Sequence, residues 1–157
     1  EQDAVLIGWA TRKRGLVMRS DERAIRGVVD LAGKRMAPRQ PKSGTAVLLD
    51  TVFGDAGVPM DEVTFTDPCH SEQDAVLAVV EGVADVTFGL EAVAGQFGLG
   101  FIPVVDERFD ILIDRKAYFE MPMQTLLTFC RSAAFIERAA ALTGYALDGL
   151  GDVRWNA

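Results

Sequence analysis

Residues Ser71 to Gly89 read SEQDAVLAVVEGVADVTFG and carry the clearest structural signals of the chain. Ser71 precedes Asp74 by three residues at the start of an apolar run, which is the capping-box pattern of a helix start. The run predicts a helix that ends at Gly82. The stretch from Asp85 to Gly89 then predicts a buried strand, and a helix leading into such a strand is typical of α/β proteins.

The same alternation of strands and helices extends to both sides of this stretch. On the N-terminal side, the pattern predicts strands at 5–10, 15–18, 35–37 and 63–66, and helices at 21–32 and from 47 to the glycines at 54–57. On the C-terminal side, it predicts a helix at 92–97, strands at 101–105 and 109–113, and helices at 122–131 and 133–142. This order predicts an α/β fold with a mixed, mostly parallel sheet flanked by helices.

Composition excludes several classes of protein. With 157 residues, of which 49% are hydrophobic, the chain is long enough for one domain or one lobe and too apolar to be disordered. No segment approaches the roughly 18 apolar residues of a membrane span, so we expect no contact with a membrane. One histidine, His70, and two cysteines, Cys69 and Cys130, match no metal-ligand spacing, and we expect neither a metal nor a cofactor.

The charges are unevenly distributed along the chain. The net charge of −7 argues against a surface devoted to nucleic acid or anionic lipid. Residues 1–50 nevertheless hold ten bases against six acids, a balance of +4, and no acid lies between Leu31 and Leu49. A solvated basic face and a binding site for a small anion both fit this pattern.

The segment Arg39 to Thr45, RQPKSGT, follows a predicted strand and opens a predicted helix. Because a helix start leaves backbone amides unpaired, a small oxyanion can bind there, with the hydroxyls of Ser43 and Thr45 as further donors and Gly44 allowing close approach. The alternative is that Ser43 only caps the helix. A Walker-type phosphate loop is excluded, because its Gly and Lys spacing is missing.

Residues 12–145 contain an ordered series of motifs that resembles a known family. The chain is similar to the type II periplasmic-binding-protein-like family, which is related to molybdate and tungstate binding proteins and to molybdate-type bacterial transcriptional regulators. The residues that carry the resemblance are Arg12 with Gly15-Leu16, Arg39-Gln40, Ser43-Gly44-Thr45, Leu48-Leu49-Asp50, Gly82 to Asp85, Gly89, Glu91-Ala92, Gly98-Leu99, Phe101, Pro103, Glu107 to Asp110, Leu126-Leu127, Phe135 and Gly144-Tyr145.

The resemblance implies that residues 1–157 form a single substrate-binding-like lobe, the second half of a two-lobed binding domain. The segments near 5–18 and 101–114 would then be crossover segments, and 122–142 would hold the C-terminal helices. A first lobe, and in some relatives a DNA-binding helix-turn-helix, would precede residue 1. A lone lobe exposes apolar surface that homodimerisation would cover.

The resemblance also suggests the ligand-binding residues. Ser43, Gly44 and Thr45 would form the anion cradle beside Arg39, and we add Arg12, Gly89 and Glu91 as candidate ligand contacts. This chain departs from the family at Pro38, Ala46 and Glu72, where relatives usually have Asn, Arg and His. Glu72 would repel an anion, so molybdate, tungstate, a carboxylate and another organic ligand all stay open.

We therefore expect a non-enzymatic domain that binds a small ligand, such as molybdate or tungstate, as the regulatory part of a longer transcriptional regulator. The alternative is the solute-binding component of an ABC-type anion transporter. No residue is assigned a catalytic role, because the candidate acids lack a His or Lys companion. We expect a cytoplasmic location for a regulator and a periplasmic one for a transport component, with no direct contact between this segment and nucleic acid.

Overall fold

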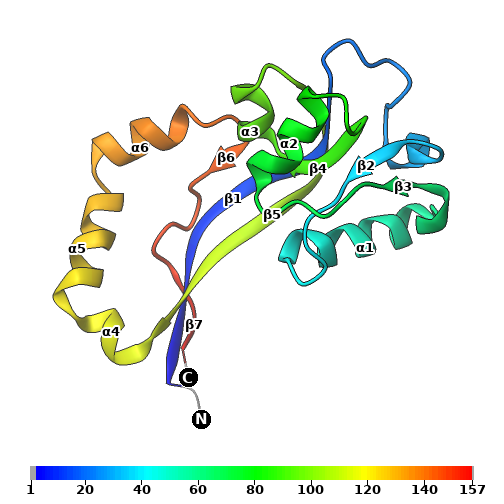
Figure 1. Ribbon diagram of the computed structural model, residues 1–157. Coiled ribbons are helices and arrows are strands. Elements are labelled where there is room, and N and C mark those ends of the chain that lie inside the picture. The colour runs from blue at the N-terminus through cyan, green and yellow to red at the C-terminus, as the bar shows by residue number, and fades with distance from the viewer. Residues whose placement is uncertain (1–2, 157) are drawn as a thin grey trace. The chain divides into compact units, whose positions relative to one another are not determined.

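The computed structural model describes residues 3–156, which divide into two compact units (Figure 1). The terminal unit contains the residues up to Arg12 together with those from Asp106 onward, and the central unit spans Lys13–Val105. Strands β1 (Ala4–Met18) and β5 (Gly100–Asp114) each contribute residues to both units.

The central unit is built on a mixed sheet. It adds β2 (Arg35–Ala37), β3 (Thr64–Phe65) and β4 (Val86–Leu90) to the two long strands, in the order β3-β2-β4-β1-β5. Strand β2 runs parallel to β3 and β4, whereas β1 runs antiparallel to β4. The α/β class is thus confirmed, but the parallel pairing that we expected for most of the sheet is confined to β2, β3 and β4.

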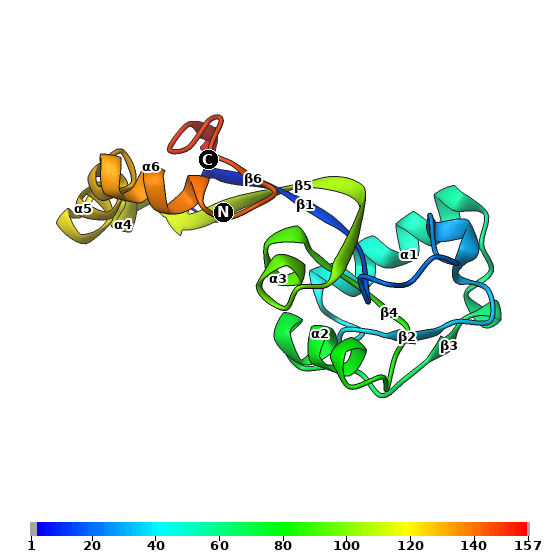
Figure 2. The ribbon, with the colours of Figure 1, turned by 90° about the horizontal axis from the view of Figure 1, so that it is seen from above.

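Helices cover both faces of this sheet (Figure 2). Leu49 of α1 packs in one apolar cluster with Leu16, while the next strand residue, Val17, packs with Val76 of α2 on the other face. Alternate residues of a strand point to opposite faces, so a strand buried on both sides is mostly apolar. The bounds of the three helices are α1 Gly44–Ala56, α2 Glu72–Val80 and α3 Glu91–Gln96.

The predicted capping box of α2 and the predicted glycine stop of α1 are confirmed. The hydroxyl of Ser71 accepts the amide of Asp74, and the Asp74 carboxylate accepts the amide of Ser71, which completes the capping box. Helix α1 ends at Gly57, whose φ of 66° is the left-handed conformation that glycine adopts without strain. Polar side chains and glycines therefore fix where the helices lie relative to the strands.

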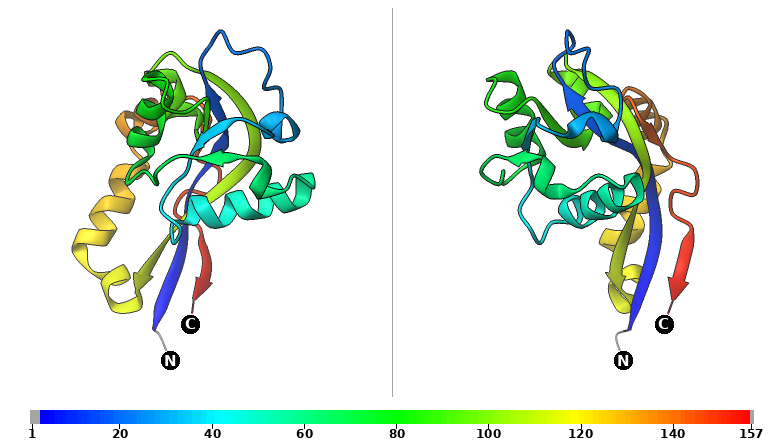
Figure 3. Two further views of the ribbon diagram at one scale, coloured as in Figure 1. Left: turned by 45° about the vertical axis from the view of Figure 1, so that its right-hand side comes forward. Right: turned by 90° about the vertical axis from the view of Figure 1, so that its right-hand side faces the viewer.

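The terminal unit packs helices and two short strands around its parts of β1 and β5. The two predicted C-terminal helices are confirmed as α5 and α6, whereas α4 and strands β6 and β7 were not predicted because they are short. Strands β6 and β7 pair antiparallel with β1 (Figure 3). The bounds are α4 Arg115–Phe119, α5 Met121–Cys130, α6 Ala133–Ala140, β6 Tyr145–Ala146 and β7 Val153–Asn156.

Two predicted strand breaks are wrong. Residues 5–10 and 15–18 belong to the single strand β1, and residues 101–105 and 109–113 belong to the single strand β5. The basic residues of β1 stay in the sheet because Arg12 forms an ion pair with Glu107 and Arg14 forms one with Glu72. Each charge thus has a protein partner and does not require exposure to water. Because of these ion pairs, β1 continues through the charged residues at which the sequence had suggested a turn.

The helix predicted at 21–32 is also wrong. Only a 3₁₀ turn at Val28–Leu31 forms there, and a second such turn forms at Met60–Glu62. The Glu22 carboxylate accepts the amide of Ala24, and the Asp30 carboxylate accepts the amide of Arg26. These side-chain bonds to the backbone compete with the amide to carbonyl bonds of an α-helix.

None of the helices within residues 3–156 is long and apolar enough to cross a membrane. The proposal that residues 1–157 are one lobe of a two-lobed domain stays a prediction.

Candidate functional site

The start of α1 carries the segment that the sequence singled out. The Ser43 hydroxyl accepts a hydrogen bond of 3.2 Å from the backbone amide of Ala46. Ser43 therefore caps α1, which is the alternative role that the sequence left open. Thr45 is only 8% exposed, and its hydroxyl donates to Glu72 at 3.1 Å. A Cβ on Gly44 would meet no protein atom within 4 Å, so nothing in the central unit itself requires glycine there.

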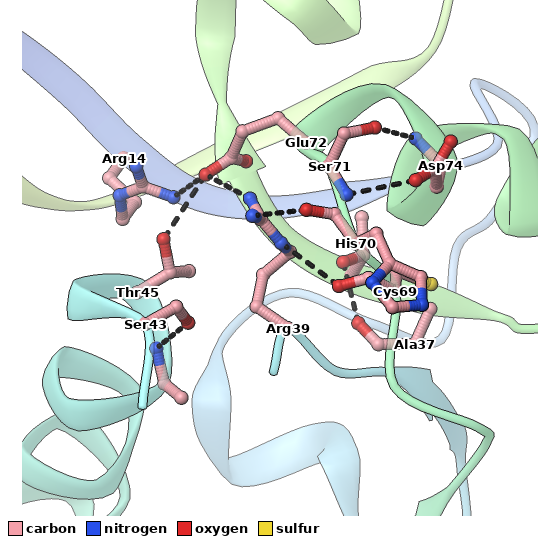
Figure 4. Close-up of polar contacts among 12 residues, drawn as sticks. Arg14, Ala37, Arg39, Ser43, Thr45, Cys69, His70, Ser71, Glu72 and Asp74 are labelled. Atoms are coloured by element: carbon pink, nitrogen blue, oxygen red, sulfur yellow. Dashed lines mark hydrogen bonds and ion pairs between the residues drawn. The ribbon is translucent and has the colours of Figure 1, made fainter. Parts of the chain in front are cut away.

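Glu72, the first residue of α2, is the centre of a charged cluster in the central unit (Figure 4). Its Oε1 atom accepts Nη1 of Arg14 at 2.9 Å and lies 3.2 Å from Nη1 of Arg39, in addition to its bond with Thr45. Strand β1, the loop after β2, and helices α1 and α2 therefore all meet at one carboxylate oxygen. We call Arg14, Arg39, Thr45 and Glu72 the Glu72 cluster.

Arg39 is also held by the chain segment that leads into α2. Its Nε donates to the carbonyl of Cys69 at 3.3 Å and its Nη2 to the carbonyl of His70 at 3.0 Å. Gln40 adds a bond of 2.7 Å between its side-chain amide and Nδ1 of His70. Because three of its nitrogens are engaged, the Arg39 guanidinium has a fixed position beside the start of α1.

The second oxygen of Glu72 differs from the first. Oε2 is buried, and no hydrogen-bond partner for it is found among the described residues. A Cβ on Gly89 would lie 3.7 Å from this oxygen and 3.1 Å from Cγ2 of Val17, so glycine leaves room at this point of β4. Gly89 therefore lies next to the Glu72 cluster, as a candidate ligand residue would, without contributing a side chain.

A cavity of about 230 Å³ in the central unit lies against the start of α1. Its polar lining includes Arg39 and Thr45 of the Glu72 cluster and the exposed acid Asp50, whereas Arg14 and Glu72 are not among the lining residues. The remaining walls are largely apolar and include Pro38, Leu49, Met60, Phe65 and Phe88. The cavity thus combines a largely apolar lining with three polar residues, Arg39, Thr45 and Asp50.

The structure brings together only part of the predicted site. Arg39, Ser43, Gly44 and Thr45 are neighbours at α1. Glu91, half-buried at the first position of α3, has no side-chain bond or ion pair to another of the described residues. Its predicted contact with a ligand stays a prediction.

Arg12 belongs to the terminal unit and has its own partners there. Its Nε lies 2.6 Å from the Glu107 carboxylate, and its guanidinium carbon lies 4.5 Å from the centre of the Phe109 ring. Burial by itself would lower the pKa of Arg12, but the hydrogen bond and charge of Glu107 raise it above the ordinary value. The role of Arg12 as a ligand contact also stays a prediction.

Sequence reasoning missed the main partners of the site. Glu72 was expected only to repel an anion, but it is instead bound by two arginines and a threonine. Arg14, which is 1% exposed, was weighed as a ligand contact or an edge residue but was not chosen as a site residue. The available signal was the strand itself, because Arg14 lies within a strand whose next four residues are all apolar or glycine.

The adjacent Cys69 and His70 show no feature of a thiol nucleophile. Burial, followed by the charge of Asp74, raises the pKa of the Cys69 thiol, which favours the unreactive protonated form. The Nδ1 atom of His70 is engaged by Gln40. This pair therefore supplies no activated nucleophile.

Comparison with known proteins places the chain in a family. The model of the PBP (periplasmic binding protein) superfamily domain matches residues 1–131. Uncharacterized protein YvgK of Bacillus subtilis is 33% identical over 144 residues, which are 89% of this chain and 46% of that protein. The chain therefore spans about half the length of this curated relative.

Solved structures share the fold at low sequence identity. The extracellular-binding protein YtmK of a probable amino-acid ABC transporter from Bacillus subtilis superposes with a TM-score of 0.63 at 15% identity, over 90% of this chain and 65% of that one. The regulatory domain of CcmR from Synechocystis, in complex with 2-PG, superposes with a TM-score of 0.66 at 14% identity. The match covers 82% of this chain and 66% of that one.

A third similar structure is the aliphatic sulphonate binding protein SsuA from Escherichia coli, with a TM-score of 0.59 at 18% identity, over 89% of this chain and 53% of that one. At these identities the similarity concerns the fold alone. Together with the match over residues 1–131, the mixed sheet flanked by helices establishes that this chain belongs to the PBP superfamily, whose members bind small ligands.

Proposed function

We propose that this chain is a non-enzymatic module that binds a small organic anion in the cavity beside α1. The observation that carries the proposal is the composition of that cavity, in which apolar walls surround about 230 Å³ and Arg39 and Thr45 line one edge. An apolar interior with a few fixed polar groups is typical of sites for small molecules. The guanidinium and the hydroxyl would bind the anionic group, and the apolar walls would bind the rest of the ligand.

The family resemblance adds the oxyanions molybdate and tungstate to the candidates. Against them, an apolar cavity offers few of the donors that a fully hydrated oxyanion requires when it leaves water. The superfamily fold also accommodates organic ligands, since similar structures include a regulatory domain in complex with 2-PG and an aliphatic sulphonate binding protein. We therefore rank organic anions ahead of inorganic ones.

In the whole protein, we propose that ligand binding serves regulation, as the sensing part of a longer transcriptional regulator. The second candidate is the solute-binding component of a transporter. Similar folds occur in both roles, in the CcmR regulatory domain and in the YtmK binding protein. A DNA-binding helix-turn-helix in the natural protein would favour regulation, and a secretory signal would favour transport.

Thermal unfolding of the full chain with a panel of ligands tests the proposal. The panel contains molybdate, tungstate, sulfate, phosphate, 2-PG, benzoate, an alkanesulfonate and arginine. Since a ligand that binds only the native state raises its stability, at least one of them should raise the melting temperature in proportion to the logarithm of its concentration.

Two matched variants locate the binding site. Ala46→Phe places a ring in the cavity that Ala46 lines, whereas Val47→Phe places the same ring on the next residue of α1, which is 59% exposed. Ala46→Phe should abolish the ligand-dependent rise, and Val47→Phe should preserve it. Equal binding by both variants would place the site elsewhere and refute the proposal.

A further inference from the structure

We infer that Glu72 is an internal competitor for the ligand: its carboxylate occupies the position on Arg39 and Thr45 that the anionic group of a ligand takes on binding. This inference rests on the proposed function and specifies how that site selects and senses its ligand. Arg39 and Thr45 both line the cavity and both bind Oε1 of Glu72. A ligand anion that reaches these two donors from the cavity must therefore replace Glu72 there.

The distances indicate which contacts of Glu72 exchange. The contact with Arg14 is the shortest, at 2.9 Å, whereas the contacts with Thr45 and Arg39 measure 3.1 and 3.2 Å. Charge-assisted bonds between a guanidinium and a carboxylate are usually about 2.7 to 2.9 Å long. Arg14 is 1% exposed and does not line the cavity, so it retains Glu72 while the two longer contacts pass to the ligand.

The unpaired second oxygen favours this movement. Oε2 of Glu72 is buried without a hydrogen-bond partner among the described residues. The carboxylate in its ligand-free position therefore makes fewer hydrogen bonds than it can accept. Movement of the side chain away from this position would let Oε2 gain a hydrogen bond, which would partly offset the two lost contacts.

The position of Arg39 fits a second anion. Arg39 is an ion-pair partner of Glu72 and lines the cavity, whereas Arg14 is paired with Glu72 away from the cavity. Once Glu72 is paired with Arg14 alone, the Arg39 charge has no partner in the cluster, and it stays in place through the carbonyls of Cys69 and His70. Asp50 also lines the cavity, but it is exposed and its charge is screened by water.

The exchange would also transmit binding to the fold. Thr45 is in α1 and Glu72 is the first residue of α2, so their bond joins the starts of two helices on opposite faces of the sheet. Replacing Glu72 by a ligand breaks this link. Ligand occupancy is thus converted into a loss of contact between α1 and α2.

Calorimetric titration of the full chain with benzoate tests the inference. Benzoate has a carboxylate head and an apolar ring, and benzamide is its uncharged counterpart. Glu72→Gln keeps the shape of the side chain but removes the competing charge, so we expect it to bind benzoate about ten-fold more tightly than the natural chain. Glu81→Gln, the same change at the exposed far end of α2, should bind benzoate as the natural chain does.

The outcomes separate the inference from the proposed function. If Ala46→Phe abolishes binding of any panel ligand but Glu72→Gln gains no affinity for benzoate, or gains equally for benzamide, the inference is wrong and the function stands. If no ligand binds either the natural chain or Glu72→Gln, both are wrong.

A second measurement does not depend on the folding of a variant. In a crystal structure of the natural chain with benzoate, the ligand carboxylate should lie within hydrogen-bond distance of Arg39 Nη1 and Thr45 Oγ1, with Glu72 retained by Arg14. A bound ligand with Glu72 still on Arg39 and Thr45 would overturn the inference.

Discussion

Oε1 of Glu72 lies 2.9 Å from Nη1 of Arg14, a pair that joins the start of α2 to a buried position of β1. The Glu72 side chain is 22% exposed, whereas the Arg14 side chain is 1% exposed. A charged side chain is costly to bury without a partner, so this pair helps Arg14 to lie inside the sheet. The same carboxylate then reaches the donors that line the cavity, which links the stability of the fold to its candidate site.

Removal of one member of this pair should destabilise the chain. Arg14→Met leaves the partly buried Glu72 with only its longer contacts, and we expect the free energy of unfolding to fall by about 2 to 4 kcal/mol, somewhat less than for a fully buried pair. Urea unfolding measures the change. The double variant Arg14→Met with Glu72→Gln should recover part of the loss, and a single variant within 0.5 kcal/mol of the natural chain, well below that estimate, would show that the pair is dispensable.

The start of α1 should be required for anion binding. Ser43→Ala combined with Thr45→Ala removes the capping hydroxyl of α1 and the hydroxyl of a cavity-lining residue, and we expect it to abolish the thermal stabilisation by any anion that stabilises the natural chain. Loss of the Ser43 cap lowers the stability of the ligand-free protein by about 1 kcal/mol, so each variant is compared with its own ligand-free form. Unchanged anion binding by the double variant would remove Ser43 and Thr45 from the site.

The pair of Arg35 and Asp85 should contribute to the pH dependence of stability. The side-chain hydrogen bond from Arg35 lowers the pKa of Asp85. Since the unfolded chain binds this proton more readily, the contribution is complete above the unfolded pKa of about 4 and is lost as the pH falls through the lower native pKa. Asp85→Asn should therefore lose stability at pH 7 and show a weaker fall of stability on acidification.

Unfolding measured between pH 7 and pH 2.5 for both proteins checks this prediction. Asp61→Asn, at an exposed residue of the second 3₁₀ turn with no ion pair to another of the described residues, serves as the control. The prediction fails if the curves for Asp85→Asn and the natural chain run parallel over the whole range.

Replacing two glycines by alanine should change the stability of the chain in opposite directions. A Cβ on Gly15 would overlap the backbone carbonyl oxygen of Ile102 in β5, so Gly15→Ala should cost about 3 kcal/mol. Gly54 lies within α1 with open space around it, and Gly54→Ala should stabilise the chain by up to about 1 kcal/mol because alanine favours helices. Denaturant midpoints of the two variants on the same side of the natural value would contradict this account.

Local chemistry made parts of the fold predictable from sequence. The Ser71 and Asp74 pattern fixed the start of α2, and glycine at 57 fixed the end of α1, because capping depends on a few consecutive residues. The apolar stretch before Gly89 predicted β4, since a strand covered on both faces must be apolar. The segment around Ser43 was recognised for the same local reason.

The sequence by itself determined the α/β class, the resemblance to the binding-protein family and, apart from the helix expected at 21–32, the order of strands and helices in the central unit. Only the tertiary structure decided that Arg14, Arg39 and Thr45 converge on Glu72, and that the basic residues of β1 stay within one strand. The physical reason is distance along the chain. Glu72 lies 58 residues from Arg14, so this partner of the buried arginine becomes visible only once the sheet and both helices are assembled.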